Sequence, residues 1–509
     1  MPSANLSGYC WPQSVEAGER VGLHLSADTG TVDVEVTRVG RRRQVVWSQE
    51  NLAVGDHPVP GDASANGCGW PAAATMEVAD GWQSGYYEVL LTAAGSGAGA
   101  GEPVQDRAFF VLRPPVNDRP GSERPSALLV LGTDTWHAYN DFGGTNLYNG
   151  GTQVSLQRPM AAGYLFKPPG LGRRVASIHP PDPKIEAHVG YLLLNHLSQW
   201  AGSAGWPNWE LPFVQWAEDN RYRFDVCTNA DLQFHPELLG RYQLMLSVGH
   251  DEYWSGPMRD TVEGFVAGGG NVAFLSGNTS FWQVRFEDDG ATMVGYKQRF
   301  AGDPVHGTDR QHELTSIWSD HLIGRPENTM TGVSFARGGY ARIGRRVPNG
   351  SGGFTVHRPD HWLFEGTGLE YGDLLGAGAT IVGYECDGCA FTYRDGLPYA
   401  TGEDSTPEGF DILGTSPAAS FTRETAARPP APGELSELEF HAWRLFDSHE
   451  PEATDRLANG HAVLGTYTSG GTVVTSGSTE WVWGLAGHDA QVEQVTRNLF
   501  SRLAGQEST

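Results

Sequence analysis

Residues 244–256 read LMLSVGHDEYWSG, and this stretch decides how the middle of the chain is interpreted. Its apolar start is typical of a strand that is buried on both faces of a parallel sheet. A His, an Asp, a Glu, a Tyr and a Trp then follow in direct succession, at the point where such a strand leaves the sheet. Large polar and aromatic side chains at the end of a buried strand are explained either by exposure to solvent or by a chemical role. The flanking sequence helps to decide between these two explanations.

Strand and helix patterns alternate on both sides of this stretch. The segment SGPMRDTVEGFVAGGG, residues 255–270, predicts a helix that starts at a Ser cap and stops at Gly268. Further helices are predicted at residues 209–220 and 490–505, and buried strands at 125–132, 222–228, 271–278 and 471–478. Alternating strands and helices predict an α/β fold with an open, mostly parallel sheet.

The two ends of the chain differ from this central part. Residues 1–115 alternate short apolar segments with turns and contain no helical stretch, so they predict a β-sandwich. The Pro-rich segment 116–126 is interpreted as a linker to the α/β domain, which we assign to residues 127–509. Within that domain, residues 300–445 form a loop-rich insertion with short strand candidates such as ATIVGYE, residues 379–385.

Charge and hydropathy exclude several classes of partner. The 509 residues include Lys+Arg 35 and Asp+Glu 60, which gives a formal net charge of -25. Such an acidic chain repels nucleic acid and anionic membrane surfaces. No apolar run approaches the roughly 18 residues needed to span a bilayer, and the N-terminus lacks a basic start followed by an apolar stretch. We therefore expect a cytoplasmic protein.

The five cysteines indicate neither a disulfide framework nor a nucleophile. Cys386 and Cys389 form a single CxxC with no second CxxC, so a closed zinc site there would need distant ligands. No cysteine falls at a strand-to-helix turn beside a histidine, and no GxSxG motif is present. Hydrolysis by this chain would therefore use metal-activated water rather than an acyl-enzyme.

Polar side chains follow the ends of several predicted strands, where open α/β sheets bind their ligands. They include Tyr139, His250, Glu252, Asn278, Glu385 and Glu480, with Trp136 beside the first of them. His250 and Glu252 are two residues apart, so in an extended segment they project to the same side. A His and a carboxylate that share a direction suit either metal ligation or proton transfer, and the spacing alone favours neither.

Five ordered motifs give the chain a family resemblance. TWHAYNDFGG, SVGHDEYWS, LSGNTSFWQVRFE, VGYECDG and SGSTEWVWGL occur in this order between about residues 125 and 505. Together they resemble the C-terminal domain of the large (beta) subunit family of N,N-dimethylformamidase. The β-rich N-terminal part agrees with the domain that precedes this module in such proteins.

The resemblance implies a sheet like that of class I glutamine amidotransferases, without the nucleophilic cysteine. It also implies a mononuclear ferric (Fe³⁺) site, held by two Tyr phenolates and one Glu, that hydrolyses a small amide. Carried over by motif, Tyr139 is one phenolate ligand and Glu252 the carboxylate ligand. His250 and Asn278 would position substrate or water beside the metal, and Glu385 would be the acid/base.

The second phenolate has no clear match, because Met160 follows the QRP motif where a tyrosine is expected. We assign it to Tyr164, the nearest tyrosine; the alternatives are Tyr148, Tyr191, His179 and His188. The insertion-like stretch after Tyr164 also indicates a reshaped pocket mouth, so dimethylformamide itself need not be the substrate. Apolar walls for a small neutral amide would come from Trp136, Phe281 and Trp282.

The leading hypothesis is therefore an iron-dependent amidohydrolase that cleaves a carbon–nitrogen bond, forms a homo-oligomer and can take a small partner subunit. A zinc or manganese hydrolase that uses His250 and Glu252 is the enzymatic alternative, since imidazole suits those metals better than phenolate does. The alternative from another class is a non-enzymatic protein whose Trp-rich sandwich binds carbohydrate, because the chain has 16 tryptophans.

Overall fold

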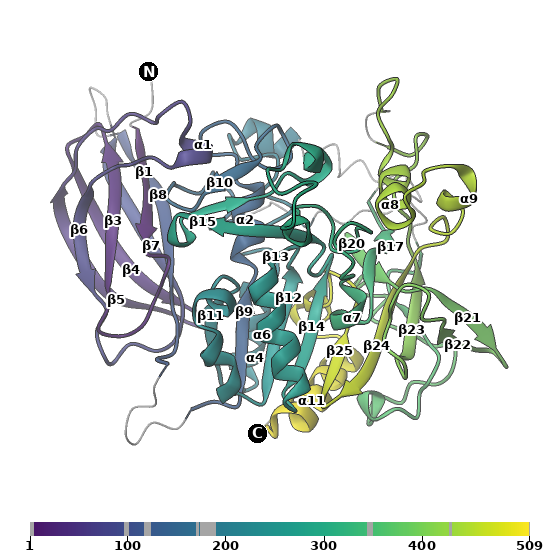
Figure 1. Cartoon of the computed structure of the whole chain (residues 1–509). Helices are drawn as coiled ribbons and strands as arrows, with labels where there is room; N and C mark the ends of the chain where they lie inside the picture. The colour runs from purple at the N-terminus through teal and green to yellow at the C-terminus, as the bar shows by residue number, and fades with distance from the viewer. Residues whose placement is uncertain are drawn as a thin grey trace.

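The computed structural model describes residues 5–95, 101–116, 124–168, 173, 190–343, 350–426 and 430–507. Figure 1 shows a β-rich part at one end, a helix-covered sheet in the middle, and smaller sheets and helices at the other end. Most of the predicted linker, residues 117–123, lies outside the described residues. No helix among the described residues has both the length and the apolar character that crossing a membrane requires.

The N-terminal part consists of two sheets around one core. One sheet has the order β1 (Leu6–Trp11), β3 (Arg20–Ala27), β6 (Ala72–Glu77); the other has the order β2 (Ser14–Val15), β8 (Gly101–Leu112), β7 (Gly85–Gly95), β4 (Thr31–Val39), β5 (Arg43–Ala53). Val32, Val34 and Val36 alternate with polar residues in β4 and are buried in this core. This part is therefore mostly β, as predicted, but it also contains one short helix at Ala63–Asn66 that the sequence pattern did not indicate.

A nine-stranded sheet forms the centre of the molecule. Its order is β11 (Phe224–Thr228), β9 (Ala127–Leu131), β12 (Leu244–His250), β14 (Asn271–Gly277), β25 (Gly471–Thr475), β24 (His461–Ser469), β23 (Asp411–Pro417), β18 (Phe354–Val356), β19 (Leu374–Leu375). The first five strands are parallel, and each later strand is antiparallel to its neighbour. β23 and β19 therefore run in the same direction as the first five strands, so the sheet is mixed but mostly parallel.

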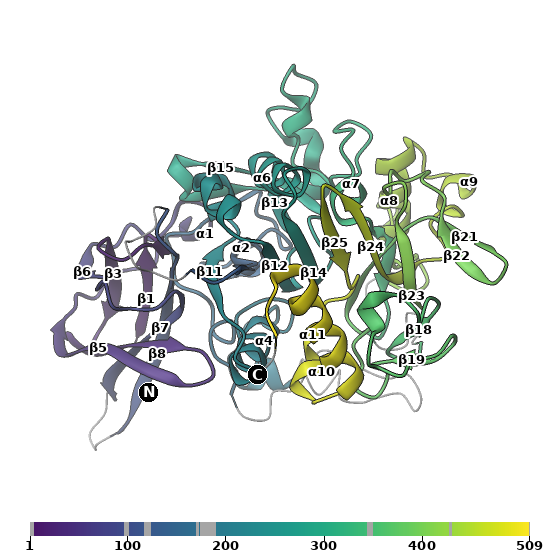
Figure 2. The same cartoon turned by 90° about the horizontal axis from the view of Figure 1, so that it is seen from below.

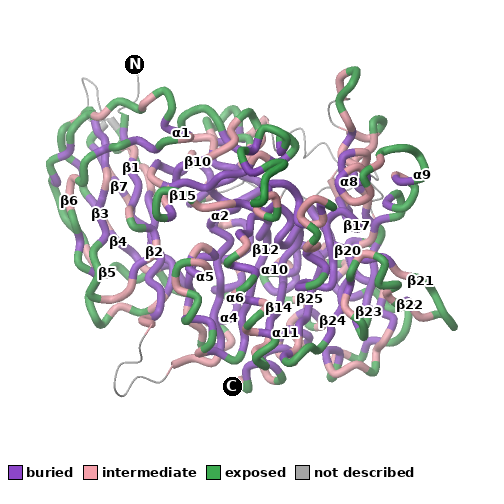
Figure 3. The backbone as a smooth tube through the Cα atoms, viewed as in Figure 1, coloured by how far each residue is buried: buried purple, intermediate pink, exposed green. Residues whose placement is uncertain are grey.

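Helices cover both faces of the parallel strands (Figure 2). On one face, α4 (Glu210–Asp219) and α11 (Ala490–Ala504) pack Phe213 and Leu499 against Leu129, Leu246 and Leu275 of the strands. On the other face, α6 (Gly256–Ala267) contributes Met258 and Val262 to a second core. The three helices agree with the sequence prediction, including the cap of α6 at Ser255 and its end at Gly268. Figure 3 shows the resulting buried centre of the sheet.

The order of the parallel strands creates a crevice. Along the chain β9 comes first and β11 second, but β11 lies at the edge and the chain then returns to β12 on the other side of β9. The connection after β9 therefore leads to one side of the sheet, and the connection after β12 leads to the other side. Open α/β sheets bind ligands at such a switch point. Helix α2 (Thr133–Tyr139) follows β9 there, and the segment after His250 follows β12.

Shorter elements from several parts of the chain complete the fold. Three small sheets have the orders β10 (Gln153–Ser155), β16 (Thr292–Val294), β15 (Trp282–Glu287), β13 (Tyr253–Ser255); β17 (Ser334–Tyr340), β20 (Glu385–Gly388); and β21 (Phe391–Arg394), β22 (Leu397–Ala400). The short helices are α1 (Ala63–Asn66), α5 (Asp231–Phe234), α7 (Asn328–Thr331), α8 (Glu437–Phe446), α9 (Pro451–Thr454) and α10 (Val482–Ala486). Short 3-10 turns lie at Pro236–Arg241, Asp288–Gly290, Lys297–Gly302, Gln311–Glu313 and Trp362–Phe364.

One strand prediction was wrong in this region. The segment ATIVGYE was expected to be a strand, but only its last residue, Glu385, is in one, as the first residue of β20. Thr380 has a φ of 57°, which turns the backbone, and Ile381 and Val382 fill the core instead of pairing in a sheet. The turn therefore brings Glu385 to the start of a strand rather than beyond the end of one.

Candidate active site

A cavity of about 210 Å³ lies at the crevice between β9 and β12. Helix α8 and strand β17 also contribute to its walls, with Glu437, Phe440 and Phe335 among the lining residues. The lining residues are Tyr139, Tyr148, Glu252, Asn278, Phe281, Trp282, Gln298, Phe335, Tyr340, Glu385, Leu435, Ser436, Glu437, Phe440 and His441. The cavity is smaller than the roughly 300–1,000 Å³ of sites for drug-sized molecules, so it suits a small ligand.

Glu385 and His250 form a buried ion pair at the cavity. Glu385 Oε2 lies 2.6 Å from His250 Nε2, and each side chain is almost wholly removed from solvent. His250 Nδ1 donates to the backbone carbonyl of Ser203 at 2.7 Å. Because both ring nitrogens face acceptors, the imidazole is held as the doubly protonated cation.

The electrostatics of this pair agree with its hydrogen bonds. Burial acts to lower the pKa of His250, but the adjacent Glu385 carboxylate outweighs burial and raises that pKa to about 9. Burial likewise acts to raise the pKa of Glu385, but the imidazolium charge and its hydrogen bond hold it below the usual range. The proton that the two groups share therefore resides on His250 at neutral pH, and Glu385 is ready to act as a base.

Asn278 orients the same carboxylate from the end of β14. Its Nδ2 donates to Glu385 Oε2 at 3.1 Å, whereas its Oδ1 is buried and has no hydrogen-bond partner among the described residues. The residue has a φ of 52°, and Asp387 accepts from the backbone N–H groups of Asn278 and Thr279 at 2.8 and 3.0 Å. The turn is thus fixed, and it leaves one amide oxygen for a water or a substrate.

Glu252 lies across the cavity among aromatic donors. Tyr148 Oη lies 2.8 and 2.7 Å from its two carboxylate oxygens, and Trp282 Nε1 donates to Oε1 at 2.7 Å. Its backbone N–H donates to Thr135 Oγ1 at 2.8 Å, which ties this residue to α2. His250 Nε2 is 3.4 Å from Glu252 Oε2, so the imidazolium bridges the two carboxylates. Burial raises the pKa of Glu252.

Lys297 and Tyr253 contact Tyr148 but are not among the residues that line the cavity. Lys297 Nζ donates to Tyr253 Oη at 2.8 Å and lies 3.1 Å from the centre of the Tyr148 ring. Tyr253 in turn donates to Tyr148 Oη at 2.8 Å. Burial lowers the pKa of Lys297 to about 7, although Glu252 opposes this shift. These contacts form a chain of hydrogen bonds that ends on the Glu252 carboxylate.

The two tyrosines predicted as metal ligands occupy different positions. Tyr139 lines the cavity, and its ring stacks on Tyr148 with 4.2 Å between the centres. Tyr164 is buried behind it and donates its hydroxyl to the backbone carbonyl of Tyr139 at 2.7 Å. Tyr148, one of the alternatives, is therefore better placed than Tyr164 to bind a metal together with Tyr139 and Glu252. The identity of the second phenolate ligand stays a prediction. His179 and His188 lie outside the described residues.

Two further predicted residues lie away from the cavity. Trp136 donates its indole N–H to Glu210 at 3.1 Å and packs against Tyr86 of the N-terminal sheets, so it is not among the lining residues. Glu480 accepts from Trp209 Nε1 at 3.2 Å and pairs with Arg173 at 2.7 Å. Phe281 and Trp282, in contrast, line the cavity as predicted.

In the described part of the chain, the cavity offers oxygen donors rather than a His, Cys, Asp and Glu cluster to a metal ion. Among the residues that the structure describes, no group of three or more His, Cys, Asp and Glu side chains is placed to hold a metal. This finding gives no support to a zinc or manganese site built on His250 and Glu252. Tyr139, Tyr148 and Glu252 offer hard oxygen donors on one cavity, and this set fits ferric iron chemically.

Lys297 was not predicted from the sequence, Tyr253 was noted at the strand exit without a role, and Tyr148 was only an alternative ligand. Tyr253 belongs to the opening motif and was visible there. Lys297 begins a short 3-10 turn just before the loop-rich region, and a single lysine in a loop carries no signal of its own. Only the fold brings that loop against the end of β12.

Comparisons with known proteins agree with the motifs. The model of the family described as N,N-dimethylformamidase beta subunit-like, C-terminal, matches residues 33–494. The N,N-dimethylformamidase beta subunit of Alcaligenes sp is 27% identical over 198 residues, which cover 35% of this chain and 24% of that protein. The beta subunit of Paracoccus aminophilus is 35% identical over 81 residues, which cover 15% of this chain and 11% of that protein. The matched parts are thus at most 24% of either relative.

Among solved structures, a family 76 glycoside hydrolase of Bacteroides thetaiotaomicron matches 22% of this chain and 20% of its own. Its TM-score is 0.12 and its sequence identity is 13%, so this similarity carries no argument about fold or function.

Proposed function

The chain belongs to the N,N-dimethylformamidase beta subunit-like family, and we propose that it hydrolyses the carbon–nitrogen bond of a small amide. The observation that carries the proposal is the cavity in which a buried base, Glu385, and a second carboxylate, Glu252, face one another among aromatic walls. The names of the relatives support amide hydrolysis as the reaction class. The size of the cavity supports a small substrate.

In the proposed mechanism the chain's own residues position a water and move its proton. Asn278 Oδ1, which has no partner among the described residues, accepts a hydrogen from the water beside Glu385. Glu385 takes a proton as the water oxygen adds to the amide carbonyl carbon. The leaving nitrogen then receives a proton from the Glu385–His250 pair as the carbon–nitrogen bond breaks, and a carboxylic acid and an amine result.

The walls of the cavity select for uncharged substrates. Phe281, Phe335 and Phe440 line it, and His441 beside them is held neutral because burial lowers its pKa to about 3. Apolar walls stabilise the N-substituents of an amide and exclude water from the reacting atoms.

We also propose that Tyr139, Tyr148 and Glu252 hold a ferric ion, with Tyr148 in place of Tyr164. Burial raises the pKa of both phenols well above their ordinary value, so a cation would be needed to hold them as phenolates. When bound, the ion would supply Lewis acidity for the amide carbonyl or a bound water. Lys297 and Tyr253 orient Tyr148 from outside this set through the hydrogen bonds described above.

We propose further features of the fold and of the assembly. The spatial order of the parallel strands supports an arrangement like that of class I glutamine amidotransferases, and the cysteine in the parallel strands, Cys227, is buried within β11. Since the relatives are described as beta subunits, we propose a partner subunit for this chain and a homo-oligomeric assembly. The carbohydrate alternative gains no support, because none of the 16 tryptophans, all in the described part of the chain, is exposed.

A panel of amides tests the proposal. Purified protein, supplied with iron, is incubated with amides of increasing size from formamide to benzanilide, and amine release is measured by chromatography. The cavity, at about 210 Å³, lies below the range of sites for drug-sized molecules. We expect turnover of N-alkylated formamides and acetamides and none of amides with two aryl groups. Equal turnover of both classes would place the reaction outside this cavity.

A further inference from the structure

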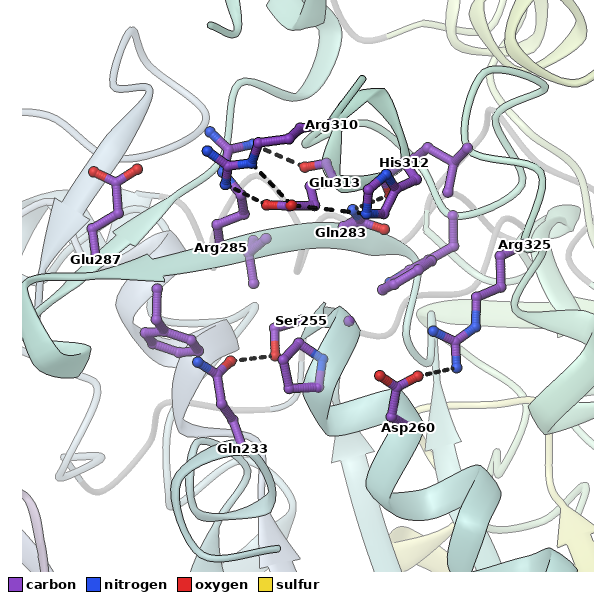
Figure 4. Close-up of a pocket in the computed structure, with 16 residues that line it drawn as sticks. Gln233, Ser255, Asp260, Gln283, Arg285, Glu287, Arg310, His312, Glu313 and Arg325 are labelled. Atoms are coloured by element: carbon purple, nitrogen blue, oxygen red, sulfur yellow. Dashed lines mark hydrogen bonds and ion pairs between the residues drawn. The ribbon is translucent and has the colours of Figure 1, made fainter. Parts of the chain in front are cut away.

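A second cavity, of about 500 Å³, provides a comparison for the charges of the candidate active site. It lies beside β15 and the first turn of α6, and Figure 4 shows two of its acidic side chains with basic partners. Arg325 lies 2.8 Å from Asp260, and Arg310 Nε donates to Glu313 at 3.0 Å. These carboxylates are therefore neutralised by the chain itself.

Glu437, which lines the candidate active site, has no such partner. Among the described residues, the donors to its carboxylate are Tyr340 Oη at 3.1 Å and the backbone N–H of Phe421 at 2.9 Å. Both donors are neutral, and Arg423, in the segment before α8, pairs with Glu439 instead. An ionised carboxylate has about four acceptor positions, so about two of those on Glu437 stay free. The residue is partly accessible, so a ligand can reach them.

The pKa of Glu437 reflects this lack of a charged donor. Burial raises the pKa to about 7, although the hydrogen bonds from Phe421 and Tyr340 oppose the shift. Repulsion from the Glu385 and Glu252 carboxylates raises it as well, as expected for three acidic groups on one cavity. Above pH 7 the charge of Glu437 is therefore stabilised by any further donor that enters the cavity.

Strand pairing places Glu437 close to the proposed base. Tyr340 of β17 lies directly opposite Glu385 of β20 in their antiparallel pairing. Side chains of opposite residues project to the same face, with about 4.5–5.5 Å between their Cβ atoms. Tyr340 also lines the cavity, and its hydroxyl donates to Glu437. One tyrosine side chain thus joins the two carboxylates along the cavity wall, so a small ligand beside Glu385 can also contact Glu437.

Several contacts hold the Glu437 carboxylate in one orientation. Ser436 caps α8 by accepting from the N–H of Glu439 at 3.3 Å, which makes Glu437 the first residue of the helix. The ring of Phe421 stacks on that of Tyr340 with 4.4 Å between the centres, so both donors to the carboxylate are fixed. A group that is oriented in advance loses less conformational entropy when a ligand binds.

The chemistry of an amide indicates what Glu437 would recognise. A simple amide has one hydrogen-bond acceptor, the carbonyl oxygen, and its only donor is the N–H group. The other two carboxylates of the cavity, Glu252 and Glu385, already face His250 Nε2 at 3.4 and 2.6 Å. Glu437 is therefore the lining carboxylate that lacks a charged donor, and an N–H group matches its free acceptor positions.

We propose that Glu437 binds the N–H group of the substrate, so that the enzyme prefers primary and secondary amides to tertiary amides. The inference rests on the proposed amide hydrolysis, because this N–H belongs to the leaving nitrogen. A tertiary amide offers no donor, and its second N-substituent would remove water from the carboxylate without replacing the hydrogen bond. This preference would set the chain apart from relatives that are named for the tertiary amide N,N-dimethylformamide.

A pair of fluorinated amides tests the inference. N-Methyltrifluoroacetamide has one N–H, and N,N-dimethyltrifluoroacetamide has none. Each ligand's fluorine NMR signal is titrated with iron-supplied protein at pH 8, where Glu437 is largely ionised, and gives a dissociation constant. The separate signal of trifluoroacetate reports cleavage. We expect Glu437→Gln to lower the affinity of the N–H amide, relative to the dimethyl amide, about tenfold, because a hydrogen bond to a charged group is lost.

The glutamine variant keeps the local contacts. Its amide oxygen can accept from the N–H of Phe421 and its amide nitrogen can donate to Tyr340, so a second N–H faces the ligand in place of an acceptor. Glu439→Gln is the matched control, because Glu439 lies on the same helix but pairs with Arg423 and is not among the lining residues. Glutamine also serves in a capping box, so this control should leave the affinity ratio unchanged.

The inference and the proposed hydrolysis can fail separately. The same affinity ratio in Glu437→Gln and in the unaltered protein would overturn the inference and leave Glu437 with a structural role alone. Absence of binding by both amides would overturn it as well. The expected change in the ratio without any trifluoroacetate would support the N–H site and count against hydrolysis only.

Discussion

The Glu385→Gln substitution separates the acid/base role of this residue from its structural role. Glutamine has nearly the same shape and can still accept a hydrogen bond from Asn278 Nδ2, which lies 3.1 Å from Glu385 Oε2. It cannot take a proton from water, however, and it removes the carboxylate that lies 2.6 Å from His250 Nε2. The fold should persist, while the proton transfer is lost.

The size of the effect follows from the role. Removal of a general acid/base lowers turnover roughly 10²–10⁴-fold, which corresponds to about 3–5 kcal/mol of activation free energy. We expect the loss in kcat, with little change in KM, because Glu385 acts on the water and not on the apolar walls. The pKa of His250 should also fall from about 9, since the carboxylate that raises it is gone.

Amine release from an accepted amide gives kcat and KM, and histidine NMR gives the pKa of His250. Glu480→Gln is the matched control: Glu480 is also buried, but it pairs with Arg173 and Trp209 rather than with His250. Unchanged turnover in Glu385→Gln would show that Glu385 is not the acid/base. Loss of turnover in Glu480→Gln alone would assign the acid/base role to Glu480.

Three other predictions test the metal set, a buried acid and a helix cap. If Tyr139 and Tyr148 bind Fe³⁺ as phenolates, the iron-loaded protein absorbs visible light. Tyr148→Phe should bleach or shift this absorption band, whereas Tyr164→Phe and His250→Ala should leave it nearly unchanged. A colourless, zinc-loaded protein would contradict the ligand set. Burial raises the pKa of Glu210 from 4.5 to about 8, so the folded state keeps a proton that the unfolded state releases, and stability falls over that pH range by up to roughly 1.4 kcal/mol per unit. In urea unfolding, the Glu210→Gln variant should therefore be as stable as the unaltered protein at pH 5 and more stable than it at pH 8. Equal stability of the two proteins at both pH values would argue against a protonated Glu210. Asp489 caps α11 by accepting hydrogen bonds from the N–H groups of Gln491 and Val492 at 3.1 Å. Asp489→Ala should therefore lower the free energy of unfolding by about 1 kcal/mol. No change in urea unfolding would show that the cap does not stabilise the fold.

The parallel half of the fold could be predicted because its signals are local. Apolar runs such as Leu244–Leu246 define buried strands, and Ser255 and Gly268 mark the ends of α6. The antiparallel half carries weaker signals, because β18 and β19 have three and two residues and depend on pairing partners far along the chain. ATIVGYE has the composition of a strand, but the turn at Thr380 is decided by the surrounding loops.

The candidate site could be predicted where its residues follow strand ends and not where loops supply them. His250, Glu252 and Asn278 leave β12 and β14 at the crevice, as strand order requires. Tyr148 and Lys297 belong to loops whose approach to Glu252 depends on tertiary packing. Trp136 lies on the same short helix as Tyr139 but projects toward the N-terminal sheets. The spacing of the two residues in the sequence did not show that they face different ways.

The central claim is that a water held at this cavity cleaves an amide carbon–nitrogen bond. Its most direct test is incubation of the iron-supplied protein with N,N-dimethylformamide and N-methylacetamide in ¹⁸O-labelled water, followed by mass spectrometry of both products. We expect amine release from at least one of these amides, one ¹⁸O atom in the carboxylic acid formed, and loss of both signals in Glu385→Gln. Release of amine without ¹⁸O in the acid, or labelled acid formed at an unchanged rate by Glu385→Gln, would contradict it.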